Sequence, residues 1–125
     1  MKKHTYCFIF GIITILLLFS CISAPISEPE EGKYRDYTYE EIIKKYGRPK
    51  YDNIYMIDNN SLGYEIDPDY SLYFTKEELE NSIEIRKLMW ENIFNNRIII
   101  VWMKNIDRQW IVFDSLEYNS KYIEF

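Results

Sequence analysis

The sequence predicts an α+β domain in which two helices lie on one face of an antiparallel sheet. Two Thr-x-x-Glu capping boxes, which begin at Thr38 and Thr75, mark the starts of two helices. Apolar residues recur at helical spacing over residues 79–94, with charged residues on the opposite side. Several other segments alternate between apolar and polar residues, as half-buried strands do. These observations place residues 34–125 in a single α+β domain.

The first segment of the chain has the form of a secretory signal. Lys2 and Lys3 precede an apolar run of 14 residues, 6–19. A transmembrane helix needs about 20 apolar residues, so the short length of this run disfavours the alternative of an uncleaved membrane anchor. Residues 1–20 are therefore predicted to be a signal peptide.

The end of this segment carries a second signal, formed by Leu18, Phe19, Ser20 and Cys21. An aliphatic residue three positions before a cysteine, with a small residue directly before it, resembles the lipobox of bacterial lipoproteins. This resemblance implies that Cys21 receives a diacylglyceryl group and becomes the lipidated N-terminus. Two acyl chains are enough for stable attachment to a membrane.

A tether and a short helix are predicted to follow. Residues 21–33 contain two prolines and several glutamates without apolar periodicity, which indicates a flexible tether. Thr38 and Glu41 form the first capping box, and Gly47 and Pro49 end the helix that it starts.

The middle of the chain is predicted to form strands. Residues 51–57 alternate loosely, residues 58–61 have turn composition, and residues 62–66 alternate again, which predicts a hairpin. Residues 70–74 are predicted to form another short strand.

The last part of the chain is predicted to contain the longest helix, over residues 76–94. Residues 98–103 are all apolar and therefore apolar on both faces, as in a central strand. Two more strands are expected at residues 109–113 and 118–125.

The two helix starts, residues 37–42 and 74–79, resemble each other, so a tandem α-β-β repeat is an alternative organisation. Capping chemistry recurs by itself wherever helices begin, and it explains the likeness without a repeat.

Composition excludes several classes of function. The leader holds Lys2, Lys3, His4 and Cys7, so the chain from Cys21 onward has 13 basic and 20 acidic residues and no histidine. Such a chain cannot build a Ser-His-Asp or Cys-His catalytic set, or a zinc site made of His and Cys. Its net charge of −7 argues against nucleic acid as a partner. We predict no cofactor.

Three acids in one turn are the candidates for catalysis or for binding a small ligand: Glu65, Asp67 and Asp69. Paired carboxylates can serve as acid and base, but acids in a turn are usually solvated and no other catalytic group accompanies these. Residues 58–69 also align with a calcium loop, in which Leu62 takes a position that needs an oxygen ligand.

The aromatic residues suggest a binding surface or a core. Tyr55 and Tyr64 are the candidates for a partner surface, because tyrosine is enriched at interfaces. Trp90, Trp102 and Trp110 lie on apolar stripes, which places them in the core by default.

Residues 37–49, with the leader and the acidic tether before them, resemble the start of the SmpA/OmlA family. Members of this family are small outer-membrane lipoproteins that support β-barrel assembly, with helices packed on an antiparallel sheet. The resemblance implies a related fold and a role in envelope protein assembly. The related β-lactamase-inhibitor-like fold uses two such units in tandem, which matches the repeat alternative.

The sequence therefore predicts a non-catalytic protein-binding lipoprotein of the cell envelope. Lipid on Cys21 would anchor it in the outer membrane, facing the periplasm, where its partner would be another envelope protein. One alternative is an inhibitor-type module that blocks an enzyme. Another is a small-ligand binder or hydrolase that uses Glu65, Asp67 and Asp69.

Replacing the lipobox cysteine tests the anchor directly. Cys21→Ser should abolish incorporation of labelled fatty acid and leave the precursor unprocessed, because the serine offers no thiol to acylate. Cys7→Ser, inside the leader, is the control and should label normally. Normal acyl labelling of the Cys21→Ser protein would refute the prediction.

Overall fold

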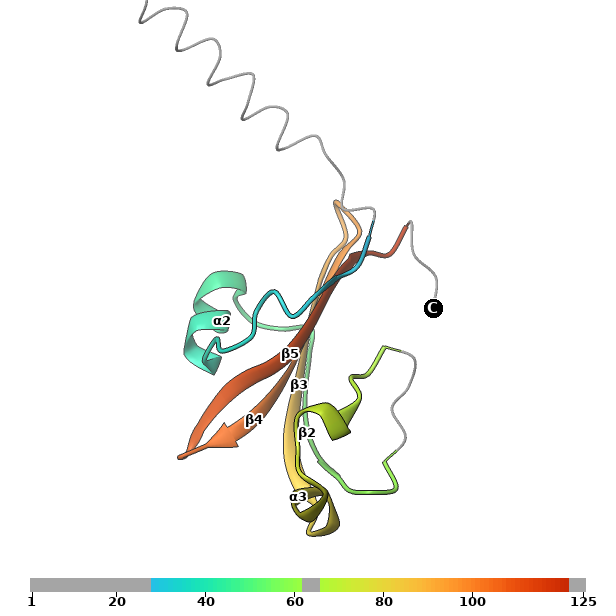
Figure 1. Cartoon of the computed structure of the whole chain (residues 1–125). Coiled ribbons are helices and arrows are strands. Elements are labelled where there is room, and N and C mark those ends of the chain that lie inside the picture. Colours follow the sequence, from blue (N-terminus) through green and yellow to red (C-terminus); the bar gives the residue numbers. More distant parts are fainter. Residues whose placement is uncertain (1–27, 62–65, 122–125) are drawn as a thin grey trace, which may run out of the picture.

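The computed structural model describes residues 28–61 and 66–121, and within them the chain folds around a five-stranded antiparallel sheet (Figure 1). The strand order is β1-β5-β4-β3-β2, which places the three longest strands side by side and leaves β1 and β2 as the edges. The strands are β1 Glu30–Glu31, β2 Tyr51–Ile57, β3 Ile83–Asn92, β4 Arg97–Ile106 and β5 Gln109–Asn119.

Three short helical segments accompany the sheet: α2 Tyr39–Tyr46, the 3-10 helix η1 Tyr70–Leu72 and α3 Lys76–Glu80. The predicted first helix is confirmed as α2. The Glu41 amide donates to Thr38 Oγ1 and the Thr38 amide donates to Glu41 Oε1, both at 3.2 Å, which is the predicted capping box. The predicted strand 51–57 is confirmed as β2, but its described pairing is with β3. Residues 62–65, most of the second strand of the predicted hairpin, lie outside the described residues.

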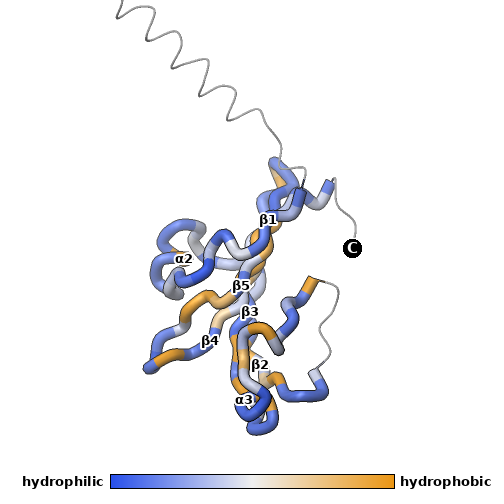
Figure 2. Tube along the Cα trace, viewed as in Figure 1, coloured by the Kyte–Doolittle hydropathy of each residue, from blue (hydrophilic) through white to orange (hydrophobic). Residues whose placement is uncertain are grey.

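The helical segments pack on opposite faces of the sheet. Ile42 of α2 belongs to a buried cluster with Leu88 and Val101, whereas Leu79 of α3 belongs to a second cluster with Ile85. In Figure 1, α2 lies to the left of the strands and α3 lies at the lower end of β3. Central strands between two covered faces need apolar side chains on both faces, and Figure 2 shows apolar residues running along these strands.

The predicted α+β class, with two helices on one face, is wrong. The molecule is mostly β, and the predicted helix 76–94 is divided between α3 and β3. Ser82 adopts a left-handed φ of 61° after the helix, and β3 starts at Ile83. Because β3 lies between β2 and β4 and is buried on both faces, its apolar residues also fit a helical stripe. The turn residues Asn81 and Ser82 were the signal that the helix stops.

Other elements also differ from prediction. The tandem α-β-β repeat is wrong, because α2 and α3 lie on opposite faces and β3 begins a β3-β4-β5 meander. Residues 70–74 contain η1 instead of a strand, and Asp69 caps η1 by accepting from the Ser71 amide at 3.1 Å. The predicted strands 109–113 and 118–125 are replaced by β5, which runs without a break to Asn119, and residues 122–125 lie outside the described residues.

The sheet begins inside the range that the sequence predicts as a tether. Glu30 of β1 lies opposite Glu117 of β5. Farther along, the Asp36 amide donates to the Val112 carbonyl and the Val112 amide donates to the Tyr37 carbonyl, each at 2.9 Å. The segment from β1 to the start of α2 therefore covers the outer edge of β5.

The second capping box allows a quantitative test of the helix start. The Glu78 amide donates to Thr75 Oγ1 at 3.1 Å, and the Thr75 amide donates to Glu78 Oε1 at 3.0 Å. We expect Thr75→Ala to lower the free energy of unfolding by about 0.5–2 kcal/mol, because a backbone donor of α3 loses its partner. Lys76→Ala, at the next exposed position, should change it by less than about 0.5 kcal/mol. Equal urea midpoints for the two variants would contradict this role of Thr75.

Candidate functional site

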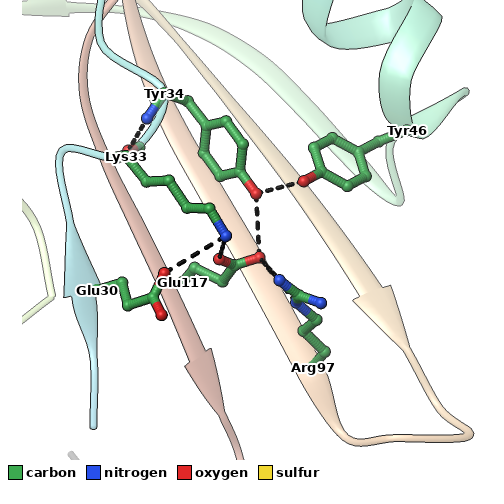
Figure 3. Close-up of polar contacts among 7 residues, drawn as sticks. Glu30, Lys33, Tyr34, Tyr46, Arg97 and Glu117 are labelled. Carbon is green, nitrogen blue, oxygen red and sulfur yellow. Dashed lines mark hydrogen bonds and ion pairs between the residues drawn. The ribbon is translucent and has the colours of Figure 1, made fainter. Parts of the chain in front are cut away.

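A cluster of charged and phenolic side chains lies at one end of the sheet (Figure 3). Its centre is Glu117, near the end of β5. Lys33 and Tyr34 reach it from the segment after β1, and Arg97 reaches it from the first position of β4. Tyr46, at the end of α2, contacts Tyr34. We call these five residues the Glu117 cluster.

The carboxylate of Glu117 is fully buried and accepts hydrogen bonds from three side chains. Lys33 Nζ donates to Oε2 at 2.8 Å, and Arg97 Nε donates to Oε1 at 2.7 Å. The Tyr34 hydroxyl lies 3.0 Å from Oε1 and also contacts the Tyr46 hydroxyl. Because a hydroxyl has one proton to donate and an ionised carboxylate has none, Tyr34 donates to Glu117 and Tyr46 donates to Tyr34.

The electrostatics of the cluster keep Glu117 ionised. Burial alone would raise the pKa of Glu117, but the hydrogen bonds from Lys33 and Arg97 outweigh burial and hold that pKa below its ordinary value. Burial, with the contact to Tyr46, raises the pKa of Tyr34, which stays a neutral donor. A carboxylate that two cations and a hydroxyl hold in its ionised form near neutral pH has a structural role, because it is a poor proton acceptor there.

An open groove of about 660 Å³ lies beside the cluster, between the end of α2 and the hairpin that joins β3 to β4. The Trp90 indole N–H donates to the Gly47 carbonyl at 3.0 Å, and Arg97 is held by Glu117. These two polar groups face the protein, but the groove is also lined by charged residues, among them Arg48, Lys50 and Glu91. The walls include Tyr46, Trp90, Arg97, Ile93 and Phe94.

Strand β2 forms an exposed edge of the sheet. It pairs with β3 on one side, and within residues 28–61 and 66–121 no other segment pairs with its outer side. Three of its large apolar side chains are exposed: Tyr51 at 43%, Ile54 at 46% and Met56 at 58%. This combination of unpaired backbone and exposed apolar side chains distinguishes β2 from β5, whose edge is covered.

The aromatic residues that were candidates for a partner surface or for the core differ in burial. Tyr55 is half-buried, packs against the core on the α3 face, and shares a hydrogen bond of 3.2 Å with the Tyr70 hydroxyl, so it is not a free surface residue. Tyr64 lies outside the described residues. Trp90 and Trp102 are buried, which confirms their assignment to the core, and Trp110 is half-buried.

The acids of the 65–69 turn are engaged in local contacts. Asp67 forms an ion pair with Lys87 at 3.1 Å, and Asp69 accepts from the Ser71 hydroxyl at 2.6 Å. Glu65, like Cys21, lies outside the described residues. Among the residues that the structure describes, no group of three or more His, Cys, Asp or Glu side chains could hold a metal ion.

The Glu117 cluster was missed by the sequence analysis. Glu117 stands between Leu116 and Tyr118, and an acid in a strand buried on both faces must find partners. That position was the available signal. No signal in the sequence indicated the partners of Glu117, because Lys33 is 84 positions away from it and Arg97 is 20 positions away.

Comparisons with protein-family models, with curated proteins and with solved structures gave no match for this chain. The resemblances to lipoproteins therefore remain predictions. In the part of the chain that the structure describes, there is no helix with the length and apolar character needed to cross a membrane.

The buried carboxylate predicts a specific acid sensitivity. The pKa of Glu117 is lower in the folded protein than in the unfolded chain, so its stabilisation is present above the ordinary glutamate pKa. It should be lost as pH falls through the folded pKa. Glu117→Gln should lower the free energy of unfolding at neutral pH by about 3 kcal/mol, near the lower limit for a broken buried pair, because Lys33 and Arg97 reach water.

The matched control is Glu91→Gln, which removes the carboxylate that pairs with Lys50 at a partly exposed position. This variant should change the free energy of unfolding by less than about 1 kcal/mol and keep the acid sensitivity of the parent. Urea unfolding between pH 3 and pH 7 measures both effects. If the free energy of unfolding of the Glu117→Gln protein depended on pH as that of the parent does, the structural role of the Glu117 carboxylate would be contradicted.

Proposed function

We propose that this protein is a lipid-anchored lipoprotein of the cell envelope that binds an extended segment of another envelope protein along the outer edge of β2. The lipid on Cys21 would hold it to the outer membrane, facing the periplasm. The observation that carries the proposal is the outer edge of β2, which pairs with no other strand among residues 28–61 and 66–121 and has three exposed apolar side chains.

The backbone of β2 supports strand addition. Exposed edges are usually protected by lysine, proline, a bulge or a covering segment, and residues 51–57 contain no lysine and no proline. The other edge of the sheet has such protection, because residues 30–38 cover β5. An unprotected edge can donate and accept main-chain hydrogen bonds with an added strand.

The side chains of β2 indicate the kind of segment that fits. Successive residues of a strand point to opposite faces, so Ile54 and Met56 lie on the α2 face and Tyr51 lies on the other. In the same strand, the Asp52 carboxylate accepts two hydrogen bonds from Arg86, at 2.9 and 2.7 Å. A partner strand with apolar residues at alternate positions would cover Ile54 and Met56.

A binding role agrees better with the side chains than a hydrolytic one. The chain from Cys21 onward has no histidine, and Asp67 and Asp69 are engaged in contacts that hold the fold. The resemblance of residues 37–49 to the SmpA/OmlA family supports a setting in outer-membrane protein assembly. An inhibitor-type module would use the same edge against an enzyme, and the identity of the bound protein distinguishes it.

Photo-crosslinking from β2 tests the proposal in intact cells. A photoreactive residue at the exposed position Asn53 should give one adduct, mapped by mass spectrometry to an extended segment of an envelope protein. Adding Ile54→Lys and Met56→Lys should reduce the adduct about tenfold or more, because two charged side chains on the edge resist strand addition. The melting temperature should stay close to that of the parent.

Two control variants make the result specific. Ile106→Lys, at an exposed position outside β2, should leave the adduct unchanged. Asp67→Asn with Asp69→Asn should also preserve it. No adduct from Asn53, together with loss of the cellular phenotype in a folded Asp67 and Asp69 variant, would reject the binding role in favour of the ligand or hydrolase alternative.

A further inference from the structure

The register of the sheet places the start of the domain at the β3–β4 hairpin. Glu30 of β1 lies opposite Glu117 of β5, and Glu117 lies opposite Ile99, the third residue of β4. Because β1 runs antiparallel to β5, the residues before Glu30 continue toward the hairpin that precedes β4. Figure 1 shows the first described residues beside the tip of this hairpin. The domain therefore meets its N-terminal segment at the hairpin end.

The tip of this hairpin presents two of the most exposed apolar side chains among the described residues. Ile93 is 73% exposed and Phe94 is 93% exposed. The turn itself is ordered by local hydrogen bonds: Asn92 Oδ1 accepts from the Phe94 amide at 3.0 Å, and Asn95 Oδ1 accepts from the Arg97 amide at 3.1 Å. The outward position of the two apolar residues is thus part of the folded structure.

The length of chain between the lipidation site and the domain limits how far the bilayer can be. Cys21 is seven residues before Glu28, and an extended chain spans at most about 3.6 Å per residue. The lipid attachment point is therefore within about 25 Å of the first described residue, which lies at the hairpin end.

We infer that Ile93 and Phe94 insert into the same bilayer that holds the lipid on Cys21, which gives the domain a second membrane contact. This inference rests on the proposed lipid anchor. The contact sets the orientation of the domain, with the hairpin tip against the membrane and the β4–β5 turn pointing away from it.

The occupant of this surface is the apolar part of the bilayer rather than its charged headgroups. Three of the nearby cations already have acidic partners, since Lys50 pairs with Glu91, and Lys33 and Arg97 pair with Glu117. Two apolar side chains hold a free protein to a membrane only weakly. The lipid anchor makes their insertion an intramolecular step, so a weak contact is sufficient.

A single-cysteine probe tests the contact in the full chain. The protein is expressed with its leader in a lipidating bacterial host and reconstituted into phosphatidylcholine vesicles. Ile93→Cys is labelled with the fluorophore NBD, which is specific because Cys21, the only other cysteine after the leader, carries lipid. Nitroxide groups on the acyl chains should quench this probe at least about twofold more than a matched probe at Ile106→Cys. Ile106 is an exposed residue at the other end of β4.

Two further measurements identify the nature of the contact. Phe94→Ser in the Ile93→Cys protein should reduce the quenching, because the remaining tip has less apolar surface to insert. Quenching should persist in about 0.5 M salt, where charge contacts are screened. Loss of quenching in salt would overturn apolar insertion.

Acylation and vesicle flotation, measured on the same samples, separate this inference from the anchor. A protein that is acylated and floats with vesicles, but whose Ile93 and Ile106 probes are quenched equally, would overturn the tip contact and leave the anchor standing. A protein without acyl groups would remove the anchor and, with it, the basis for this inference.

Discussion

The rest of the fold depends on the buried carboxylate of Glu117. It binds Lys33 and Tyr34 from the N-terminal segment and Arg97 from β4, and no local interaction would bring these two segments together. A buried charge is costly unless it is paired and hydrogen-bonded, so the N-terminal segment must lie along β5 for the sheet to keep Glu117 inside. The Glu117 cluster therefore fixes the position at which the N-terminal segment pairs with the sheet.

The position of that segment makes the two edges of the sheet unequal. It covers β5, through β1 and through the hydrogen bonds that Val112 makes with Asp36 and Tyr37. The helical segments cover the two faces of the sheet, where Ile42 and Leu79 belong to the two buried clusters. With the β5 edge and both faces covered, β2 is left as the long strand whose outer side has no partner among the described residues.

Local chemistry could be predicted from the sequence, whereas burial on both faces of a strand could not. The capping boxes at Thr38 and Thr75 were predicted correctly, because each depends on side chains three residues apart. Residues 83–92 were predicted to be helical, because a strand covered on both faces has no simple alternation. The Glu117 cluster could not be assembled from the sequence, because Lys33, Tyr34 and Arg97 meet Glu117 through the pairing of β1 and β4 with β5, and Tyr46 joins them from α2.

The hairpin tip and the β2 edge together constrain the geometry of any partner. Tyr51 lies opposite Met89, near the hairpin end, and Ile57 lies opposite Ile83 at the far end. If the tip rests on the bilayer, β2 runs away from the membrane, and its seven residues extend over about 23 Å at 3.3 Å per residue. A segment that lies flat on the membrane could pair with only the first residues of this edge. If both proposals hold, the partner would be a strand that projects from the membrane surface into the aqueous compartment, with its apolar positions facing Ile54 and Met56.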